Sequence, residues 1–121
     1  MTAVQSLIYK GESEKAKAYI SSVAGFLRTI METGQKTFIS LNEEIETATH
    51  YMDLEQKRKA FRYELHSSPG LDFTQIEFPP LLLQPILENS IRHGFGNTIA
   101  QPLLTIEIVR EEKNLVVIIR D

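Results

Sequence analysis

Apolar positions in the first half of the chain recur with the period of an α-helix. Between Ser13 and Thr33 they follow a 4-3-4-3 spacing, widened on one side by two aromatic residues; the positions are Ala16, Ile20, Val23, Leu27 and Ile30, with Tyr19 and Phe26. This spacing predicts a helix whose apolar seam needs a helical partner. Gly34 follows as a helix stop.

A second helix is predicted over residues 41–59. Ser40 and Glu43 match a capping box, in which the hydroxyl and the carboxylate each accept a hydrogen bond from a free backbone N–H. The seam of this helix is Leu41, Ile45, Ala48 and Met52. Because a short connection joins the two helices, we expect an antiparallel hairpin. The spacing fits a helical pair within one chain and a dimer equally well.

The period changes after Lys59. Apolar and polar residues alternate over 61–66, which predicts a half-buried strand. Pro79 and Pro80 suit the first turn of a further helix, which Gly94 and Gly96 end. Segments 103–110 and 115–121 are rich in Ile, Val and Leu and predict an antiparallel hairpin around a turn at 111–114. The order helix, helix, strand, helix, strand, strand indicates an α+β fold.

Composition narrows the possible functions. The 121 residues carry 13 basic and 16 acidic side chains, a net charge of −3, so the chain lacks the broad positive surface expected of a nucleic-acid partner. Without cysteine there is no disulfide, thiolate metal site or cysteine nucleophile. No apolar run approaches the roughly 18 to 20 residues that span a bilayer, and the N-terminus lacks a signal-peptide pattern.

The predicted helix at 80–94 places four chemically useful side chains in one sector. Its apolar sector is expected to hold Leu83, Ile86, Leu87, Ser90 and Ile91. On the other side, Asn89 offers an amide oxygen to Mg²⁺, and Glu88 can orient a nucleophile or a metal-bound water. Arg92 and His93 can donate hydrogen bonds to phosphate oxygens. The same spacing also fits a solvated surface helix with a Glu88–Arg92 pair, so spacing alone does not decide.

The sequence of segment 79–94 is Pro-Pro-Leu-Leu-Leu-Gln-Pro-Ile-Leu-Glu-Asn-Ser-Ile-Arg-His-Gly. It closely resembles the N box of LytS-type sensor histidine kinases. Segments 40–46 and 51–58 resemble the part of that family that joins its helices to its ATPase domain. Residues 3–8 are similar to the sequence after the family's phosphoacceptor histidine, and 116–121 to the strand that leads into its adenine-binding box.

The resemblance implies part of a two-component kinase that moves a phosphoryl group from MgATP to a histidine and then to a response regulator. ATP and Mg²⁺ would be its cofactors. By the same resemblance, Asn89 binds Mg²⁺, Glu88 assists transfer, Arg92 and His93 contact phosphates, and Asp121 receives the adenine amino group. Arg92 stands where lysine is commoner, which keeps the charge and changes the hydrogen-bond geometry.

The resemblance also implies a helical dimerisation region at 1–59 and an incomplete Bergerat-type ATP-binding domain, a partial α/β sandwich, at 60–121. We expect a homodimer, a cytoplasmic location and a membrane-anchored parent. Because the resemblance covers only the middle of a kinase, we expect the isolated chain to be inactive. The alternatives are a non-catalytic dimerisation or docking module and a GHKL ATPase of another branch.

The other two histidines match no functional pattern. His50 lacks the acidic neighbour usual beside a phosphoacceptor and is expected on the solvent face of its helix. His66 is expected to be a polar residue near a loop. No three-ligand cluster indicates zinc.

Overall fold

The computed structural model describes residues 5, 11, 13–95 and 101–121. Its main elements, in chain order, are α2 (Ser13–Thr33), β1 (Ile39–Ser40), α3 (Leu41–Glu55), β2 (Arg62–Ser67), the 3₁₀ turn η1 (Phe73–Gln75), β3 (Glu77–Phe78), α4 (Leu83–Asn89), the π turn η2 (Ser90–Gly94), β4 (Leu103–Glu111) and β5 (Asn114–Arg120). The α+β prediction is confirmed. The expected stop at Gly96 and most of the segment 3–8 lie outside the described residues.

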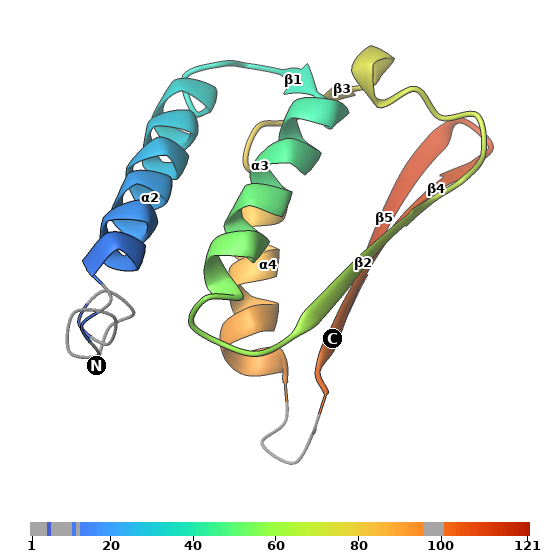
Figure 1. The fold of residues 1–121 in the computed structure, drawn as a ribbon. Coiled ribbons are helices and arrows are strands. Elements are labelled where there is room, and N and C mark those ends of the chain that lie inside the picture. The colour runs from blue at the N-terminus through green and yellow to red at the C-terminus, as the bar shows by residue number, and fades with distance from the viewer. Residues whose placement is uncertain (1–4, 6–10, 12, 96–100) are drawn as a thin grey trace.

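Helices α2 and α3 form the predicted antiparallel hairpin (Figure 1). Helix α4 lies beside α3 and runs in the same direction, and the three-stranded sheet covers the side of this pair that faces away from α2 (Figure 1). The helix that resembles the N box is therefore enclosed by α3 and by the sheet. This leaves only part of its circumference for solvent.

The larger sheet has the strand order β2-β4-β5. Strands β2 and β4 are parallel, with Arg62 opposite Leu103, and β4 and β5 form the predicted antiparallel hairpin, with Glu111 opposite Asn114. A parallel pair needs a crossover connection, and the chain between β2 and β4 contains α4. The topology itself thus places α4 against the sheet.

A second, two-stranded sheet was not predicted, because two-residue strands are too short to show a period. Ile39 pairs with Phe78 and Ser40 with Glu77, in antiparallel register. The backbone N–H of Leu41 then donates to the carbonyl of Ile76 at 2.8 Å. These bonds fasten the start of α3 to the chain that leads into α4.

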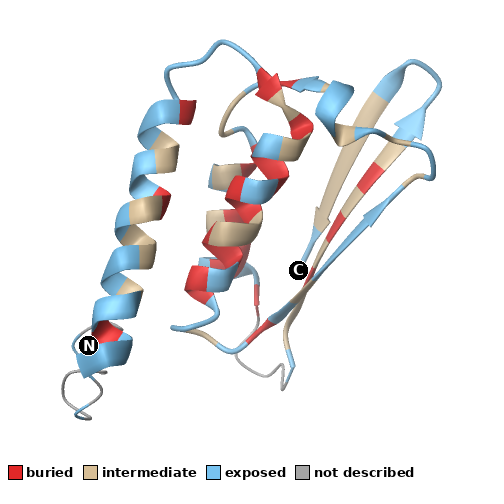
Figure 2. Cartoon of the chain, turned by 45° about the horizontal axis from the view of Figure 1, so that its top comes forward, coloured by how far each residue is buried: buried red, intermediate tan, exposed pale blue. Residues whose placement is uncertain are grey.

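One hydrophobic core joins the elements, and its most deeply buried residues belong to α3, α4, η2 and β4. Figure 2 shows in red how the buried positions are spread over the helices and the sheet. Leu41, Leu87, Leu104 and Ile108 have no exposed surface. The predicted seam of α3 is confirmed, since Leu41, Ile45, Ala48 and Met52 are all buried. The segments before and after Lys59 both contribute residues to this one core.

The prediction for α2 was wrong in one respect: the predicted apolar seam combines residues from two adjacent stripes of the helix, and only one of these stripes faces the core. The seam toward the core follows a 3-4-3-4-3 spacing: Ala16, Tyr19, Val23, Phe26, Ile30 and Thr33. Ile20 and Leu27 point away from it and are 52% and 53% exposed. The Phe26 ring meets the His50 and Tyr51 rings of α3, and Tyr19 packs against the same core, which turns the neighbouring stripe outward.

The N-terminus of α4 also differs from the prediction. The helix begins at Leu83, and Pro79 and Pro80 precede it in a turn where Leu81 has a left-handed φ of 62°. Pro85 is the proline that occupies the first turn. Ile86, expected to be buried, is 47% exposed. The helix ends at Gly94, as predicted, but as a π turn from Ser90 onward.

Both ends of α3 were predicted only in part. Ser40 accepts from the N–H of Glu43 at 3.1 Å, as in a capping box, but the Glu43 carboxylate lies 3.7 Å from the ammonium of Lys36 instead of returning to Ser40. At the other end the helix stops at Glu55 instead of Lys59. There the backbone changes to tighter turns, in which Arg58 N–H bonds the Glu55 carbonyl at 3.0 Å.

Candidate functional site

The helix formed by α4 and η2 separates apolar and polar side chains as the sequence predicts. Leu87 and Ile91 are buried at 0% and 1% exposure. Glu88 is half-buried, and Asn89, Arg92 and His93 are exposed. An acid, an amide, a guanidinium and an imidazole are thus available to a ligand approaching from solvent.

The π turn changes how these four side chains are spaced. In a continuous α-helix, Arg92 and His93 would lie one turn above Glu88 and Asn89. A π turn closes its hydrogen bonds over five residues, which shifts the side chains after Ser90 relative to those before it. Such turns are frequent at functional sites. Sequence periodicity could not reveal it, because both helical forms leave the same residues on the polar side.

Asp121 lies against the end of this helix. The Asp121 carboxylate occupies the space that a Cβ at position 94 would take, so a larger residue there would require the exposed Asp121 side chain to move. Asp121 is 27 positions after Gly94 in the sequence, and the β4–β5 hairpin brings the two together. The fifth predicted site residue therefore joins the same end of the helix as Arg92 and His93.

Tyr51 on α3 is a residue of this region that the sequence did not single out as functional. Its side chain is 6% exposed, and its hydroxyl, which is buried, has no hydrogen-bond partner. Burial raises the pKa of Tyr51 to about 12, with further raising by the negative charges of Glu55 and Glu88 and a lowering by Arg92. The phenol thus lies within the electrostatic reach of two predicted site residues.

The other two histidines lie elsewhere. His50 is half-buried and packs edge-on against the Phe26 ring, with centroids 5.5 Å apart, so the expected solvent-face position was wrong. The reason is that this face of α3 meets the aromatic seam of α2. His66 is exposed near the end of β2 and lies 3.0 Å from the Glu64 carboxylate, as a loop-proximal polar residue should.

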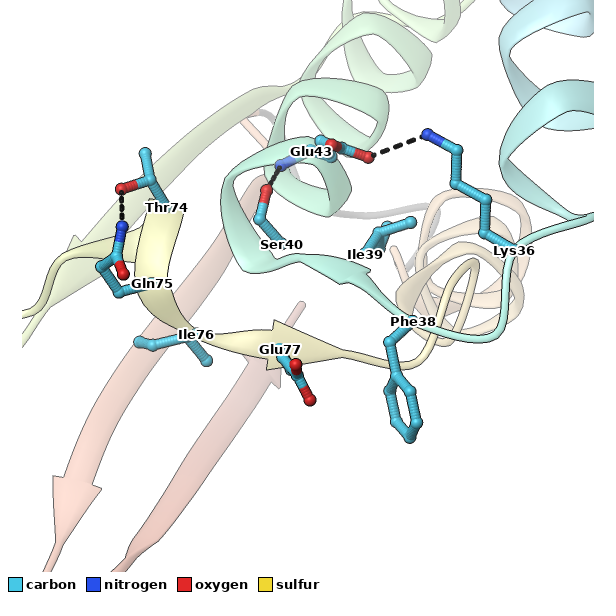
Figure 3. Close-up of a pocket in the computed structure, with 9 residues that line it drawn as sticks. All are labelled: Lys36, Phe38, Ile39, Ser40, Glu43, Thr74, Gln75, Ile76 and Glu77. Carbon is cyan, nitrogen blue, oxygen red and sulfur yellow. Dashed lines mark hydrogen bonds and ion pairs between the residues drawn. The ribbon is translucent and has the colours of Figure 1, made fainter.

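A cavity of about 370 Å³ lies at the other end of the helical hairpin, around β1, β3 and η1 (Figure 3). None of its lining residues belongs to α4. Its polar groups are largely engaged with one another, as in the Ser40 cap and the Lys36–Glu43 pair (Figure 3). This cavity is therefore separate from the polar side of α4.

Within the described part of the chain, no group of three or more His, Asp or Glu side chains is arranged to hold a metal ion. A Mg²⁺ ion that keeps most of its waters needs few protein ligands, so the single amide of Asn89 remains compatible with such an ion. Among the same described residues, no helix is both long and apolar enough to cross a membrane.

We predict that Tyr51→Phe leaves the free energy of unfolding unchanged at pH 7 or raises it by up to about 1 kcal/mol, because it removes a buried hydroxyl without a partner. Tyr63→Phe is the matched control. The Tyr63 hydroxyl donates to Asp53 at 2.7 Å, and its loss should cost roughly 0.5–1.5 kcal/mol. Urea denaturation of both variants measures the difference.

The Tyr51→Phe variant also tests the raised pKa of the Tyr51 phenol. An unfolded tyrosine ionises near pH 10 and Tyr51 in the folded chain near 12, so between these values the unfolded state binds fewer protons and stability falls as pH rises. The fall should be smaller in Tyr51→Phe than in the parent chain. An identical fall in stability in both proteins would contradict the raised pKa of Tyr51.

Residues 1–64 match the family model described as "Histidine kinase". This match spans 64 of 121 residues, more than half of the chain. It covers α2, α3 and the start of β2.

Several named proteins are similar over most of the chain. Sensor protein LytS of Oceanobacillus iheyensis is 30% identical over 112 residues, which are 91% of this chain and 19% of that protein. Sensor histidine kinase BtsS of Escherichia coli K12 is 27% identical over 114 residues, 94% of this chain and 20% of the relative. Sensor histidine kinase/phosphatase LytS of Staphylococcus aureus Mu50 is 26% identical over 106 residues, 88% of this chain and 18% of the relative.

The chain spans about a fifth of the length of these relatives. The similarity nevertheless extends beyond residues 1–64, which the family model matches. The alignments with LytS of O. iheyensis and BtsS of E. coli cover 91% and 94% of the chain and so include residues after position 64. Together these matches show that the chain belongs to the histidine kinase family.

Proposed function

We propose that this chain is part of a sensor histidine kinase that phosphorylates a histidine from MgATP and passes the phosphoryl group to a response regulator. The observation that carries the proposal is the polar side of α4 and η2. It presents a carboxylate, an amide, a guanidinium and an imidazole on one short helix, and Asp121 lies against the end of that helix. Membership of the histidine kinase family supports a kinase role, and the similarity to LytS and BtsS sensor kinases over more than 90% of the chain supports this use of the helix.

The donor set fits a magnesium nucleotide. The exposed Asn89 presents a neutral oxygen to a hard cation. Arg92 and His93 are both exposed: the Arg92 guanidinium can neutralise phosphate charge, a main requirement of phosphoryl transfer, and a His93 ring N–H can donate a hydrogen bond to a phosphate oxygen. The Asp121 carboxylate can accept a hydrogen bond from an adenine amino group. The bound nucleotide supplies the γ-phosphoryl group.

Glu88 is proposed to assist the transfer itself. In that step a bond forms between a histidine nitrogen and the γ-phosphorus, while the bond from that phosphorus to the bridging oxygen breaks and ADP leaves. A half-buried carboxylate beside the amide ligand is placed to orient the attacking imidazole by accepting its ring N–H. The phosphoryl group then moves to an aspartate of the response regulator.

Two further parts of the proposal concern organisation. Residues 1–59 would form the dimerisation region and 60–121 part of the ATP-binding domain. The outward stripe of α2 supports a homodimer, since Ile20, Ala24, Leu27 and Met31 follow a 4-3-4 spacing and are all exposed. We also propose that the chain belongs to the cytoplasmic part of a membrane-anchored protein.

The nucleotide site is tested in the full-length gene product that contains these residues. Asn89→Ala should weaken MgATP binding at least about ten-fold in isothermal titration calorimetry, a loss of about 1.4 kcal/mol. Glu88→Gln should bind MgATP normally and lose transfer of radiolabelled phosphate to an acid-labile, base-stable phosphohistidine by roughly 10²-fold or more. Asn114→Ala, at an exposed asparagine that begins β5, is the control.

Other outcomes would favour the alternatives. Unchanged MgATP binding in Asn89→Ala would contradict the nucleotide site and favour a docking module. Nucleotide hydrolysis with Asn89 dependence but without any phosphohistidine would instead indicate a GHKL ATPase of another branch.

The dimer is tested by substituting one residue of the outward stripe. Leu27→Lys should convert a dimer into a monomer in light scattering coupled to size exclusion, because it buries a charge in the seam. Ser21→Lys, exposed on the same helix but about 100° away from Ile20, should remain dimeric. A monomeric parent chain at micromolar concentration, or a dimeric Leu27→Lys chain, would refute the proposed interface.

A further inference from the structure

The N-terminus of α4 has no cap of its own. Leu82, at the cap position, has helical backbone angles and makes no capping hydrogen bond from its side chain. Pro85 in the first turn carries no N–H, which removes one of the donors that a helix start leaves free. The N–H of Leu83, the first helical residue, still needs an acceptor.

Glu44 of α3 supplies that acceptor from 39 positions away in the sequence. One carboxylate oxygen accepts from Leu83 N–H at 2.9 Å, and the other accepts from Leu81 N–H at 2.8 Å. Glu44 is only 2% exposed, so its charge is compensated by these two bonds and by the positive end of the α4 dipole. The bond to Leu81 also holds that residue in its left-handed conformation, which a non-glycine residue rarely adopts.

Lys59 contacts the other end of the same helix. Its ammonium donates to the carbonyl of Ile91 at 2.8 Å, within the π turn, and lies 5.3 Å from the centre of the Phe95 ring. A cation is favourable at this end, where the helix dipole is negative. The Lys59 side chain also has packing support, since the Phe95 ring lies 5.6 Å from the Phe61 ring.

Both residues come from one segment of the chain. Glu44 lies in the first turn of α3, and Lys59 follows the end of α3 by four residues. Because α3 and α4 run in the same direction (Figure 1), α3 and the turn that follows it reach both ends of α4. Tyr51 lies between them and is close enough for Glu88 and Arg92 to affect its pKa. These contacts therefore set the position of α4 along α3 and its rotation about its own axis, and with them the direction of its polar side chains.

We propose that Glu44 and Lys59 are positioning residues of the nucleotide site: they clamp α4 by its two ends and thereby hold Glu88 and Asn89 where they meet MgATP. Taking Glu88 and Asn89 as nucleotide-binding residues rests on the proposed function. The clamp itself rests only on the contacts of Glu44 and Lys59 with α4.

Hydrogen–deuterium exchange of the chain tests the clamp without any nucleotide. Glu44→Gln is chosen over Glu44→Ala because it keeps the size of the side chain and leaves one of its two acceptors, so the variant should still fold. Exchange of the Leu81 and Leu83 amides should rise roughly ten-fold or more, and the increase should extend to residues 88–93. Glu46→Gln, exposed on the same helix and bonded only to Asn42, should change neither.

The second end is tested in the same way. Lys59→Met should raise exchange at the π turn, whereas Lys57→Met, an exposed lysine two residues earlier, should not. If both clamp variants left exchange of residues 88–93 at the parent rate, the clamp would be refuted. A change confined to Leu81 and Leu83 would also refute it, because it would show a local cap that positions nothing beyond the first turn.

Calorimetry on the full-length gene product separates positioning from stability. Glu44→Gln should raise the Kd for MgATP about ten-fold at unchanged stoichiometry, while a merely structural role would lower the stoichiometry and leave the Kd of the folded molecules unaltered. Lower stoichiometry with an unchanged Kd would thus overturn the inference. If the parent protein bound no MgATP at all, the proposed function would fail, and the clamp would be decided by exchange alone.

Discussion

The placement of the candidate site depends on one buried carboxylate. Glu44 accepts hydrogen bonds from Leu81 and Leu83 and so fixes where α4 begins. Without it, the helix would start at a leucine turn with a left-handed residue and no acceptor for its first N–H groups. Burying a charge is costly, and the cost is offset here by two charge-assisted bonds at the positive end of a helix. In the proposed account, this contact sets where the solvent-facing side chains of α4 begin along the helix.

Around this contact, each neighbouring element limits the freedom of α4 in a different way. The parallel pairing of β2 and β4 requires a crossover, which confines α4 to the sheet. The short β1–β3 pair joins the start of α3 to the chain before α4. Lys59 and the packed rings of Phe61 and Phe95 hold the far end. The polar side chains are thus carried on a helix that is contacted at both ends and buried along one side, a preorganisation suited to the proposed phosphoryl transfer.

The sequence predicted the parts of this fold that depend on local periodicity. The seam of α3, the β4–β5 hairpin and the exposed side of α4 all follow from repeats that one segment contains within itself. It did not predict the features that depend on partners distant in the chain. The choice between the two stripes of α2 depends on the Phe26 ring meeting α3, and the start of α4 depends on Glu44. The π turn at Ser90 was equally hidden, because the buried and exposed residues are the same in either helical form. Of the candidate site, the residue types were predictable, whereas Tyr51, Glu44 and Lys59 became apparent only from their contacts.

The central claim is that the solvent side of α4 binds a magnesium nucleotide through Asn89. It is tested most directly by replacing Mg²⁺ with paramagnetic Mn²⁺, which accepts the same oxygen ligands, and recording the side-chain amide signals of asparagine in the full-length gene product. The account predicts that MnATP broadens the Asn89 amide strongly and leaves the Asn114 amide, at the start of β5, sharp. An Asn89 signal that stays as sharp as that of Asn114 at saturating MnATP would contradict it.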